Sequence, residues 1–253
     1  MKEFTRTYSV IHLDSIYKNI EEAKKRVGSD TKIMAIVKAN AYGHGAVEVA
    51  GAIKDKVYGF AVATVREALT LRESGVDNPI LVLGYVCKAE YESVIRNNII
   101  FAMLTKDMAK DISECAVRIG ITAKCHIKIN TGMNRIGFPV NEEAIDDIAE
   151  LTGYEGLDCE GIFMHFATAD SADKSYAKHQ FELFTSVIDE VEKKLGKKFK
   201  IRHCANTGAV ARYPETWLDM VRPGLLLYGY GDFAQELGLK PVMSLKTTVS
   251  TIK

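Results

Sequence analysis

One lysine stands at the end of a predicted strand near the N-terminus. Lys38 follows the apolar run Met34–Val37 and precedes a loop of mostly small residues, Ala39–Gly45. A lysine at the end of a buried strand is partly removed from water, which favours its neutral and nucleophilic form. Such an amine can form an imine with an aldehyde. The alternative is a lysine that extends its ammonium group to solvent and does no chemistry, so Lys38 alone does not decide between the two.

Polar and apolar residues alternate along the predicted strand Lys124–Asn130. The apolar positions of this strand are Cys125, Ile127 and Ile129. If these positions face surrounding helices, His126, Lys128 and Asn130 point into the interior of the sheet. Polar groups buried there cost free energy unless they are paired, and Arg135 follows on the next turn. The group forms either a buried salt-bridge network without chemistry or part of a site, and polar residues at other strand ends favour a site.

Three further strand ends carry polar residues or glycine. His165 follows one predicted strand, Asn206 and Thr207 follow the next and precede a helix, and Arg222 and Gly224 follow the last. A helix start offers backbone N–H groups to an anion, and glycine allows the backbone to approach a ligand closely. Each feature alone is weak, because a core histidine or an ordinary turn gives the same letters. Together with Lys38 they predict a site for a phosphorylated aldehyde cofactor held as a lysine imine.

Short apolar runs alternate with helical patterns along the chain. Several runs are apolar on both faces, as strands of a buried parallel sheet are. The pattern predicts an α/β fold of the (β/α)8 barrel class, in which active sites gather at the C-terminal ends of the strands. An open doubly wound sheet is the alternative, because periodicity does not show closure. The predicted strands are Ile33–Val37, Gly59–Ala63, Ile80–Leu83, Ile99–Leu104, Lys124–Asn130, Cys159–Phe166, Lys200–Ala205 and Met220–Leu227.

Capping residues predict where the helices begin and end. Small polar residues accept hydrogen bonds from the first N–H groups of a helix, and glycine often ends one. Thr64 with Glu67 has the spacing of a capping box. The expected starts are Asp14, Thr64, Thr105, Asn141 and Ser175, and four of these helices end before Gly28, Gly75, Gly120 and Gly196.

The amino-acid composition excludes several classes to which this protein could belong. The 253 residues suffice for one barrel or two smaller domains, and 47% hydrophobic residues with only five prolines exclude disorder. Lys plus Arg and Asp plus Glu are 33 each, so no positive surplus favours nucleic acid as a partner. We expect no signal peptide and no membrane span, because Met1–Arg6 is charged and the apolar runs are short. Five cysteines without zinc spacing indicate reduced thiols in a cytoplasmic protein with no metal site.

Four motifs resemble those of the alanine racemase family. Residues 35–45, AIVKANAYGHG, are similar to the family's attachment motif for pyridoxal phosphate (PLP). Residues 126–137 (HIKINTGMNRIG), 203–207 (HCANT) and 221–229 (VRPGLLLYG) resemble three more. The motifs occur in family order across nearly the whole chain, and the lysine motif is highly specific. The resemblance implies a fold-type III PLP enzyme whose N-terminal barrel binds the cofactor.

The resemblance also implies roles for individual residues. Lys38 would carry PLP as an imine and act as one of two opposed bases at the substrate Cα. Arg222, with His165 beside it, would face the pyridine nitrogen and keep it unprotonated. Arg135 would contact the phenolic oxygen and the substrate carboxylate, and Lys128 matches a lysine that many family members carry in carboxylated form. The other expected cofactor contacts are Tyr42, Asn206, Thr207, Gly224 and Leu225.

The implied activity is the interconversion of L- and D-alanine by two-base proton transfer at Cα, which supplies D-alanine for peptidoglycan. Residues 14–231 would form the PLP-binding barrel, residues 1–13 a strand of a β-domain, and residues 232–253 a linker and first strand of the same domain. In the family that C-terminal β-domain carries the opposite base, a tyrosine, and acts across a homodimer interface. The chain ends before the tyrosine motif, so we expect a truncated C-terminal domain and weak activity of this chain alone.

Three alternatives stay open. A serine racemase of the same family differs in side-chain selectivity, which depends partly on the C-terminal domain. A single-domain barrel that binds or carries PLP without turnover shares the fold and the lysine, but such proteins lack the motif around Lys38 and the strand after residue 240. A lysine-imine aldolase barrel usually places its lysine on a later strand.

Overall fold

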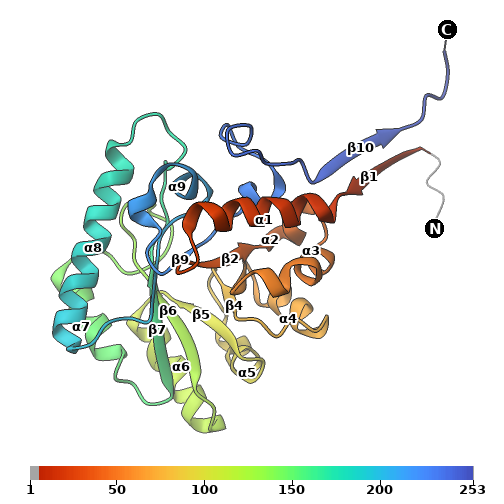
Figure 1. Cartoon of the computed structure of the whole chain (residues 1–253). Coiled ribbons are helices and arrows are strands. Elements are labelled where there is room, and N and C mark those ends of the chain that lie inside the picture. The colour runs from red at the N-terminus through yellow and green to blue at the C-terminus, as the bar shows by residue number, and fades with distance from the viewer. Residues whose placement is uncertain (1–5, 253) are drawn as a thin grey trace.

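Eight parallel strands form the central sheet of the molecule. The computed structural model describes residues 6–252, so residues 1–5 and 253 of the predicted terminal segments lie outside it. The strands are hydrogen-bonded in the order β8-β7-β6-β5-β4-β3-β2-β9 (Figure 1). They are β2 (Lys32–Ile36), β3 (Gly59–Val62), β4 (Ile80–Val82), β5 (Ile99–Met103), β6 (Ala123–Lys128), β7 (Leu157–Phe163), β8 (Ile201–His203) and β9 (Met220–Val221).

The sheet closes into a barrel where its two end strands, β8 and β9, meet. The N–H of Asp219 donates to the carbonyl of Arg202 (3.1 Å), and the N–H of Arg222 donates to the carbonyl of Ala205 (2.9 Å). These two bonds lie at opposite ends of β9. The Arg202 guanidinium reinforces the seam by donating to the Asp219 carboxylate (2.8 Å). The predicted barrel is therefore confirmed, and the open sheet is excluded.

The last strand is much shorter than predicted. The predicted range Met220–Leu227 is wrong, because β9 ends at Val221 and a 3₁₀ helix occupies Leu225–Tyr228. Pro223 has no N–H with which to continue a strand ladder. Gly224 turns the backbone away (φ −115°, ψ −93°). The apolar run Leu225–Leu227 thus belongs to a helical turn next to the barrel mouth rather than to a strand, with Leu226 and Leu227 buried and Leu225 exposed.

Helices surround the barrel on its outside (Figure 1). Thr64, Thr105 and Asn141 cap their helices with side-chain oxygens, as predicted. None of the helices in the described part of the chain is both long and apolar enough to cross a membrane. The helices are α1 (Leu13–Val27), α3 (Ala46–Ile53), α4 (Val65–Glu73), α5 (Tyr91–Arg96), α6 (Lys106–Ile119), α7 (Glu142–Leu151), α8 (Ser175–Leu195) and α9 (Thr207–Arg212), with a left-handed turn labelled α2 (Lys38–Gly43).

The predicted cap of the first helix is wrong. α1 begins at Leu13 with His12 as its N-cap residue, and Asp14 lies inside the first turn without capping it. The N–H of His12 donates to the carbonyl of Val242 (2.7 Å), a contact from a segment remote in sequence. This tertiary bond fixes where the chain leaves its strand, and the helix therefore begins before Asp14.

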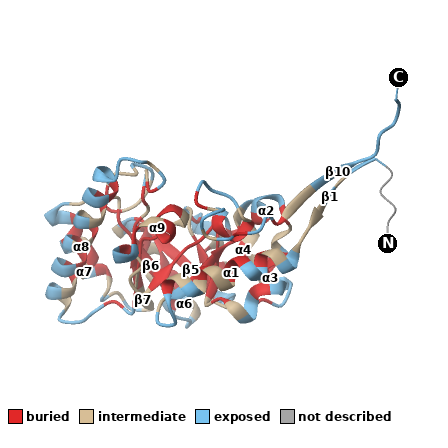
Figure 2. Ribbon diagram, turned by 45° about the horizontal axis from the view of Figure 1, so that its top comes forward, coloured by how far each residue is buried: buried red, intermediate tan, exposed pale blue. Residues whose placement is uncertain are grey.

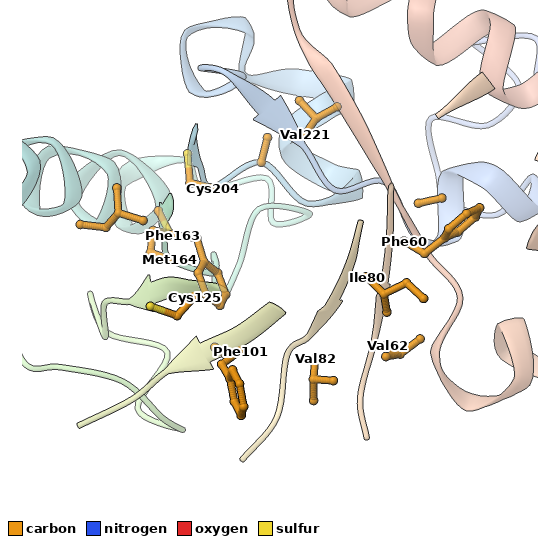
Figure 3. Close-up of a cluster of buried hydrophobic side chains, with 14 of the residues drawn as sticks. Phe60, Val62, Ile80, Val82, Phe101, Cys125, Phe163, Met164, Cys204 and Val221 are labelled. Carbon is orange, nitrogen blue, oxygen red and sulfur yellow. The ribbon is translucent and has the colours of Figure 1, made fainter. Parts of the chain in front are cut away.

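The hydrophobic core has an interior part and an outer part. The interior apolar layer of the barrel consists of Met34, Ile36, Ala61, Leu81, Ile100, Ile201 and Met220. The intervening strand residues pack against the helices, and Figure 3 shows Phe60 and Val62, Ile80 and Val82, and Phe101 on successive strands. Cys125 and Ile127 of β6, and Ile129 directly after it, are the outer positions, as predicted. Because side chains alternate along a strand, His126 and Lys128 face the barrel interior.

A two-stranded antiparallel sheet stands apart from the barrel. It pairs β1 (Thr7–Ile11) with β10 (Met243–Thr247), which lies within the predicted strand after residue 240. Figures 1 and 2 show this ribbon extending away from the body of the molecule toward both ends of the chain. The side chain of Leu245 on it is 76% exposed, so the ribbon leaves apolar surface uncovered in this chain.

Candidate active site

A cavity of about 770 Å³ lies at the C-terminal ends of the barrel strands. Its lining comes from segments that follow nearly every strand, as expected of an active site in this fold. The residues to which the family resemblance assigns a role all line this one cavity. They are Lys38, Tyr42, Lys128, Arg135, His165, Asn206, Thr207, Arg222, Gly224 and Leu225.

Lys38 opens a left-handed turn of the backbone. The next four residues have φ between 51° and 55°, although none of them is glycine. Left-handed conformation costs a non-glycine residue roughly 1–2 kcal/mol, so the surroundings must hold this turn. Asn40 accepts from the N–H of Ala46 (2.8 Å), and Nδ1 of His44 lies 2.8 Å from the carbonyl oxygen of Ala41. Lys38 is therefore followed by a strained turn that several hydrogen bonds hold in place.

The amine of Lys38 is shifted toward its neutral form. Burial lowers its pKa, and the positive charge of Arg135 lowers the pKa further, whereas Glu67 acts in the opposite direction. A larger neutral fraction makes the amine a better nucleophile toward an aldehyde. The side chain itself is half-buried, so a ligand in the cavity can reach it.

The Arg222 guanidinium is buried and fixed by acceptors on several sides. Its Nη2 donates to the carbonyls of Met164 (2.8 Å) and Cys204 (3.3 Å) and lies 3.4 Å from Nδ1 of His165. Its Nη1 donates to Nδ1 of His203 (2.9 Å). Burial lowers the pKa of Arg222 to about 10, so it still carries its charge at neutral pH. The guanidinium is thus a rigid cationic donor at the floor of the cavity.

Arg222 begins a chain of hydrogen bonds across the barrel interior. Because Arg222 donates to Nδ1 of His203, the proton of His203 is assigned to Nε2, which donates to Nδ1 of His126 (2.8 Å). His126 then carries its proton on Nε2, which lies 3.8 Å from the Glu160 carboxylate. Burial, followed by the charge of Arg222, lowers the pKa of His203, and burial lowers that of His126, so both rings stay neutral.

A β-bulge makes room for the His126 ring. Cys125 pairs with Cys159, but His126 pairs with Gly161, so Glu160 is the extra residue on β7. A Cβ atom on Gly161 would lie only 2.5 Å from Cγ of His126. The glycine and the bulge therefore let the imidazole pack against the backbone of β7.

Lys128 lies buried beside the same cavity. Its Nζ donates to the carbonyl of Ile129 (2.6 Å) and sits 5.7 Å from the ring centroid of Phe163. Burial lowers the pKa of Lys128 to about 7, with the charges of Arg222 and Arg135 as further causes. About half of the amine is consequently neutral near pH 7, which is the form able to attack an electrophile such as carbon dioxide.

Asn130 does not join the polar interior, contrary to the prediction. Its Oδ1 accepts from the N–H groups of Gly132 (3.3 Å) and Asn134 (2.9 Å), so it shapes the loop that carries Arg135 instead. A polar residue just past the end of β6 bonds its own turn because the strand ladder no longer occupies those donors.

The sequence-based search missed Gln180 of α8. This side chain is fully buried, and its Oε1 accepts from the N–H of Ala167 (2.9 Å) in the segment after His165. Its Nε2 lies 3.4 Å from both Thr131 Oγ1 and the carbonyl oxygen of His165. Gln180 thus joins two cavity-lining segments. A glutamine on the apolar stripe of a long helix was the signal that could have found it.

The cavity ends of β8 and β9 offer donors that fit a phosphate group. Thr207 Oγ1 accepts from the N–H groups of Gly224 (2.8 Å) and Leu226 (3.4 Å), so a hydroxyl and two amides converge. A Cβ atom on Gly224 would lie 3.1 Å from the hydroxyl oxygen of Tyr42, which shows how closely that hydroxyl approaches. Burial raises the pKa of Tyr42, so its hydroxyl keeps the proton it can donate. Hydroxyls and backbone N–H groups suit PLP's phosphate, and the Lys38 amine suits its aldehyde.

No cluster of metal-ligating side chains stands out in the site. Among residues 6–252, no three His, Cys, Asp or Glu side chains are grouped so that they can hold a metal ion. Burial lowers the pKa of His165 to about 3, so this ring is neutral as well. The cavity-facing charges named above are therefore mainly positive, which suits an anionic ligand.

Comparisons with known proteins agree with this site. The family described as "Alanine racemase, N-terminal domain" matches residues 11–232. The alanine racemase of Desulforamulus reducens is 43% identical over 251 residues, covering 97% of this chain and 68% of that protein. The alanine racemase of Clostridium tetani is 42% identical and covers 100% of this chain and 66% of its own length.

A solved structure of a relative shows the same fold. The alanine racemase of Clostridium difficile 630, in complex with cycloserine, superposes with a TM-score of 0.95 at 40% sequence identity. The match covers 100% of this chain and 70% of that one. This chain thus spans about two thirds of the length of the curated relatives that it matches. On the family match and these identities, the chain belongs to the alanine racemase family.

Proposed function

We propose that this chain forms the cofactor-binding barrel of a PLP-dependent alanine racemase that interconverts L- and D-alanine. The observation that carries the proposal is one cavity lined both by the Lys38 amine and by the converging donors of Thr207 and Gly224. Because the chain spans about two thirds of its relatives, racemisation is proposed for the whole protein to which this barrel belongs.

Two groups of cavity residues would bind the cofactor, one at its phosphate and the other at its aldehyde. Tyr42, Asn206, Thr207, Gly224 and Leu225 would bind the phosphate, and Lys38 would bind the aldehyde carbon as an imine. When bound, the pyridine ring of PLP withdraws electrons from the Cα of an amino acid joined to it, which makes the Cα hydrogen acidic. Arg222 would face the ring nitrogen, and its role there is to donate a hydrogen bond while retaining its own charge.

Lys38 would move the proton at the substrate Cα on one face. Its amine is shifted toward the neutral form, which lets it accept the Cα proton and return it. Inversion requires a second base on the opposite face, and the family resemblance assigns it to a tyrosine of the C-terminal β-domain. Arg135, an exposed cation at the cavity, would orient the substrate carboxylate.

Lys128 would support Arg135 in carboxylated form. A carbamate at Lys128 would place a negative charge next to Arg135 and Arg222, where the side chain otherwise adds a third cation. The pKa of about 7 supports this proposal, because carbon dioxide reacts with the neutral amine.

We propose the same domain division as the resemblance implies, with residues 14–231 as the barrel and residues 1–13 and 232–253 in a β-domain. The antiparallel pairing of β1 with β10, apart from the barrel, supports it. The exposed side chains of Leu245, Val249 and Ile252 leave apolar surface that further β-structure can cover. A homodimer in the cytoplasm, with a free amino acid as substrate, completes the proposal.

Trapping the cofactor on the protein tests the proposed function. The chain is incubated with PLP, reduced with borohydride and digested, and the pyridoxyl group is located by mass spectrometry. We expect the label on Lys38 and its loss in Lys38→Ala. Lys128 serves as an internal competitor, because it also has a lowered pKa and lines the same cavity. A label on Lys128 or on a surface lysine would overturn the assignment.

A further inference from the structure

The Glu67 carboxylate bridges the ends of two barrel strands. Its Oε1 accepts from the N–H of Ala39 (2.6 Å), the residue directly after Lys38. Its Oε2 accepts from the N–H groups of Ala63 (2.7 Å) and Thr64 (3.2 Å), just past the end of β3. One side chain of α4 thus ties the start of the left-handed turn to the neighbouring strand.

Helix capping alone does not account for these contacts. Of the three bonds that the carboxylate accepts, a capping box requires only the one from the Thr64 N–H, and that bond is the longest. Glu90 provides a comparison within the same chain, because it occupies the equivalent position of a second capping box. Within residues 6–252, its carboxylate accepts only from the N–H of Cys87 (3.4 Å). The two short bonds of Glu67 therefore serve something other than the cap.

The bond to Ala39 acts where the backbone is most disfavoured. Ala39 is the first residue of the left-handed turn (φ 51°, ψ 48°). An alanine in this conformation needs outside contacts to stay there, and a carboxylate is a stronger acceptor than a neutral group. The N–H of Ala39 belongs to the peptide group that joins it to Lys38. Fixing this peptide group fixes the direction in which the Lys38 side chain leaves the backbone.

We propose that Glu67 is a positioning residue that aims the Lys38 amine at the aldehyde carbon of the cofactor. The inference rests on the proposed function, since it assumes an imine at Lys38. Glu67 lies outside the four motifs that carry the family resemblance, and it contacts the backbone on both sides of the β2–β3 pair. The Glu67 carboxylate is also close enough to act on the amine electrostatically, because its charge raises the pKa of Lys38 against burial and Arg135.

Two ligands separate positioning from general support of the fold. PLP binds through its phosphate, its ring and an imine to Lys38, whereas pyridoxamine phosphate has no aldehyde and binds through the phosphate and ring alone. In Glu67→Gln the side chain keeps its size, but its NH2 group cannot accept from a backbone N–H. We expect the Kd of PLP to rise about tenfold to a hundredfold, because a charge-assisted bond at the lysine is lost. The Kd of pyridoxamine phosphate should change less than about twofold.

Glu90→Gln is the matched control, with a capping contact but none near Lys38, and it should leave both Kd values unchanged. Thr64→Ala removes the cap while leaving the bonds to Ala39 and Ala63, so it should lower stability without changing the ratio of the two Kd values. Should Glu67→Gln fail to fold, Glu67→Asp keeps a carboxylate that is too short to reach both strands, and we expect the same selective loss of PLP affinity.

The outcomes distinguish this inference from the proposed function. A wild-type chain that binds PLP no more tightly than pyridoxamine phosphate would overturn both, because no imine then contributes. A wild-type preference for PLP that survives in Glu67→Gln and Glu67→Asp would overturn the positioning role alone. Equal weakening of both ligands would likewise overturn it, since Glu67 would then support only the fold. Borohydride trapping on Lys38 verifies in each case that the imine is measured.

Discussion

Two layers of side chains fill the interior of this barrel, and they hold together by different means. The interior apolar layer consists of Met34, Ile36, Ala61, Leu81, Ile100, Ile201 and Met220. The polar layer consists of His126, Lys128, His203 and Arg222, all of them buried. Met220 lies on β9 and Arg222 directly follows that strand, so one segment contributes to both layers.

The two layers differ in whether their contacts are directional: apolar packing is not, and hydrogen bonds are. An apolar side chain packs against whatever fills the space, so swaps that conserve volume are tolerated. In the polar layer the hydrogen bonds tie particular atoms together in fixed directions, as in the chain from Arg222 through His203 to His126. Removing one member leaves the others without a partner in a region closed to water. The polar layer, which contributes Lys128 and Arg222 to the cavity, should therefore tolerate substitution less well than the apolar layer.

The variant Arg222→Met tests the difference between the layers, and we expect it to change the free energy of unfolding most. The carbonyls of Met164 and Cys204 and Nδ1 of His203 would lose their donor in the interior. At about 1 kcal/mol or more for each unsatisfied group, the free energy of unfolding should fall by about 3 kcal/mol. Urea denaturation followed by circular dichroism measures it.

Met220→Leu is the matched change in the apolar layer. It conserves volume and should cost less than about 1.5 kcal/mol. If both variants lost the same stability, or if Arg222→Met were as stable as the wild type, the distinction between the two layers would be wrong.

Local patterns in the sequence were enough to predict most of the fold. All eight strands were located, because each is a short apolar run between helical patterns, and the caps at Thr64, Thr105 and Asn141 were found from single residues and their neighbours. The predictions that failed depend on remote contacts. α1 begins before Asp14 because His12 bonds Val242, and β9 ends early because the chain turns at Pro223.

The sequence selected residues that the structure brings to one cavity, but it did not predict the hydrogen bonds between them. Residues at strand ends meet at one end of a barrel by topology alone, so their types suffice to select them. The pairing of His126 with His203 joins residues 77 positions apart, and no local pattern specifies it. The left-handed turn after Lys38 was equally hidden, because alanine, asparagine and tyrosine there do not signal positive φ as glycine does.

Gly161→Ala tests whether the polar layer depends on its backbone support. A Cβ atom at this position would lie 2.5 Å from His126 Cγ, and the ring is held by His203 and cannot move aside freely. Overpacking of this kind should cost about 1–3 kcal/mol. Thermal unfolding measures the loss, and the NMR signals of the His126 ring protons should shift with it.

Gly51→Ala is the matched glycine control. Gly51 lies within α3 and has open space where a Cβ would be. Alanine there should stabilise the chain by about 0.4–1 kcal/mol, because it restricts the unfolded chain and favours the helix. A Gly161→Ala protein at least as stable as the wild type would show that β7 yields readily and that the bulge does not constrain the ring.

The smallest expected effect, counted per pH unit, is a pH dependence that Lys128 confers on stability. Its pKa in the folded chain is about 7, below the ordinary value of 10.5. Between these two pH values the unfolded chain binds a proton that the folded chain does not, so stability rises with pH across this window. The slope reaches at most about 1.4 kcal/mol per pH unit. Below pH 7 both states are protonated, and the cost of burying the ammonium is present in full.

The comparison of wild type with Lys128→Met isolates this contribution, because the other titrating groups are common to both proteins. Urea midpoints between pH 6 and pH 10 in carbon dioxide-free buffer should rise more steeply for the wild type than for the variant. Bicarbonate then sharpens the test, because a carbamate that forms only on the folded chain should raise the urea midpoints of the wild type and leave those of Lys128→Met unchanged. A labelled carbamate signal in ¹³C NMR from ¹³C-bicarbonate, absent in Lys128→Met, would assign the cause. Equal slopes in carbon dioxide-free buffer would mean that the Lys128 amine keeps its ordinary pKa inside the barrel, and that the polar layer accepts a buried cation without any shift toward the neutral form.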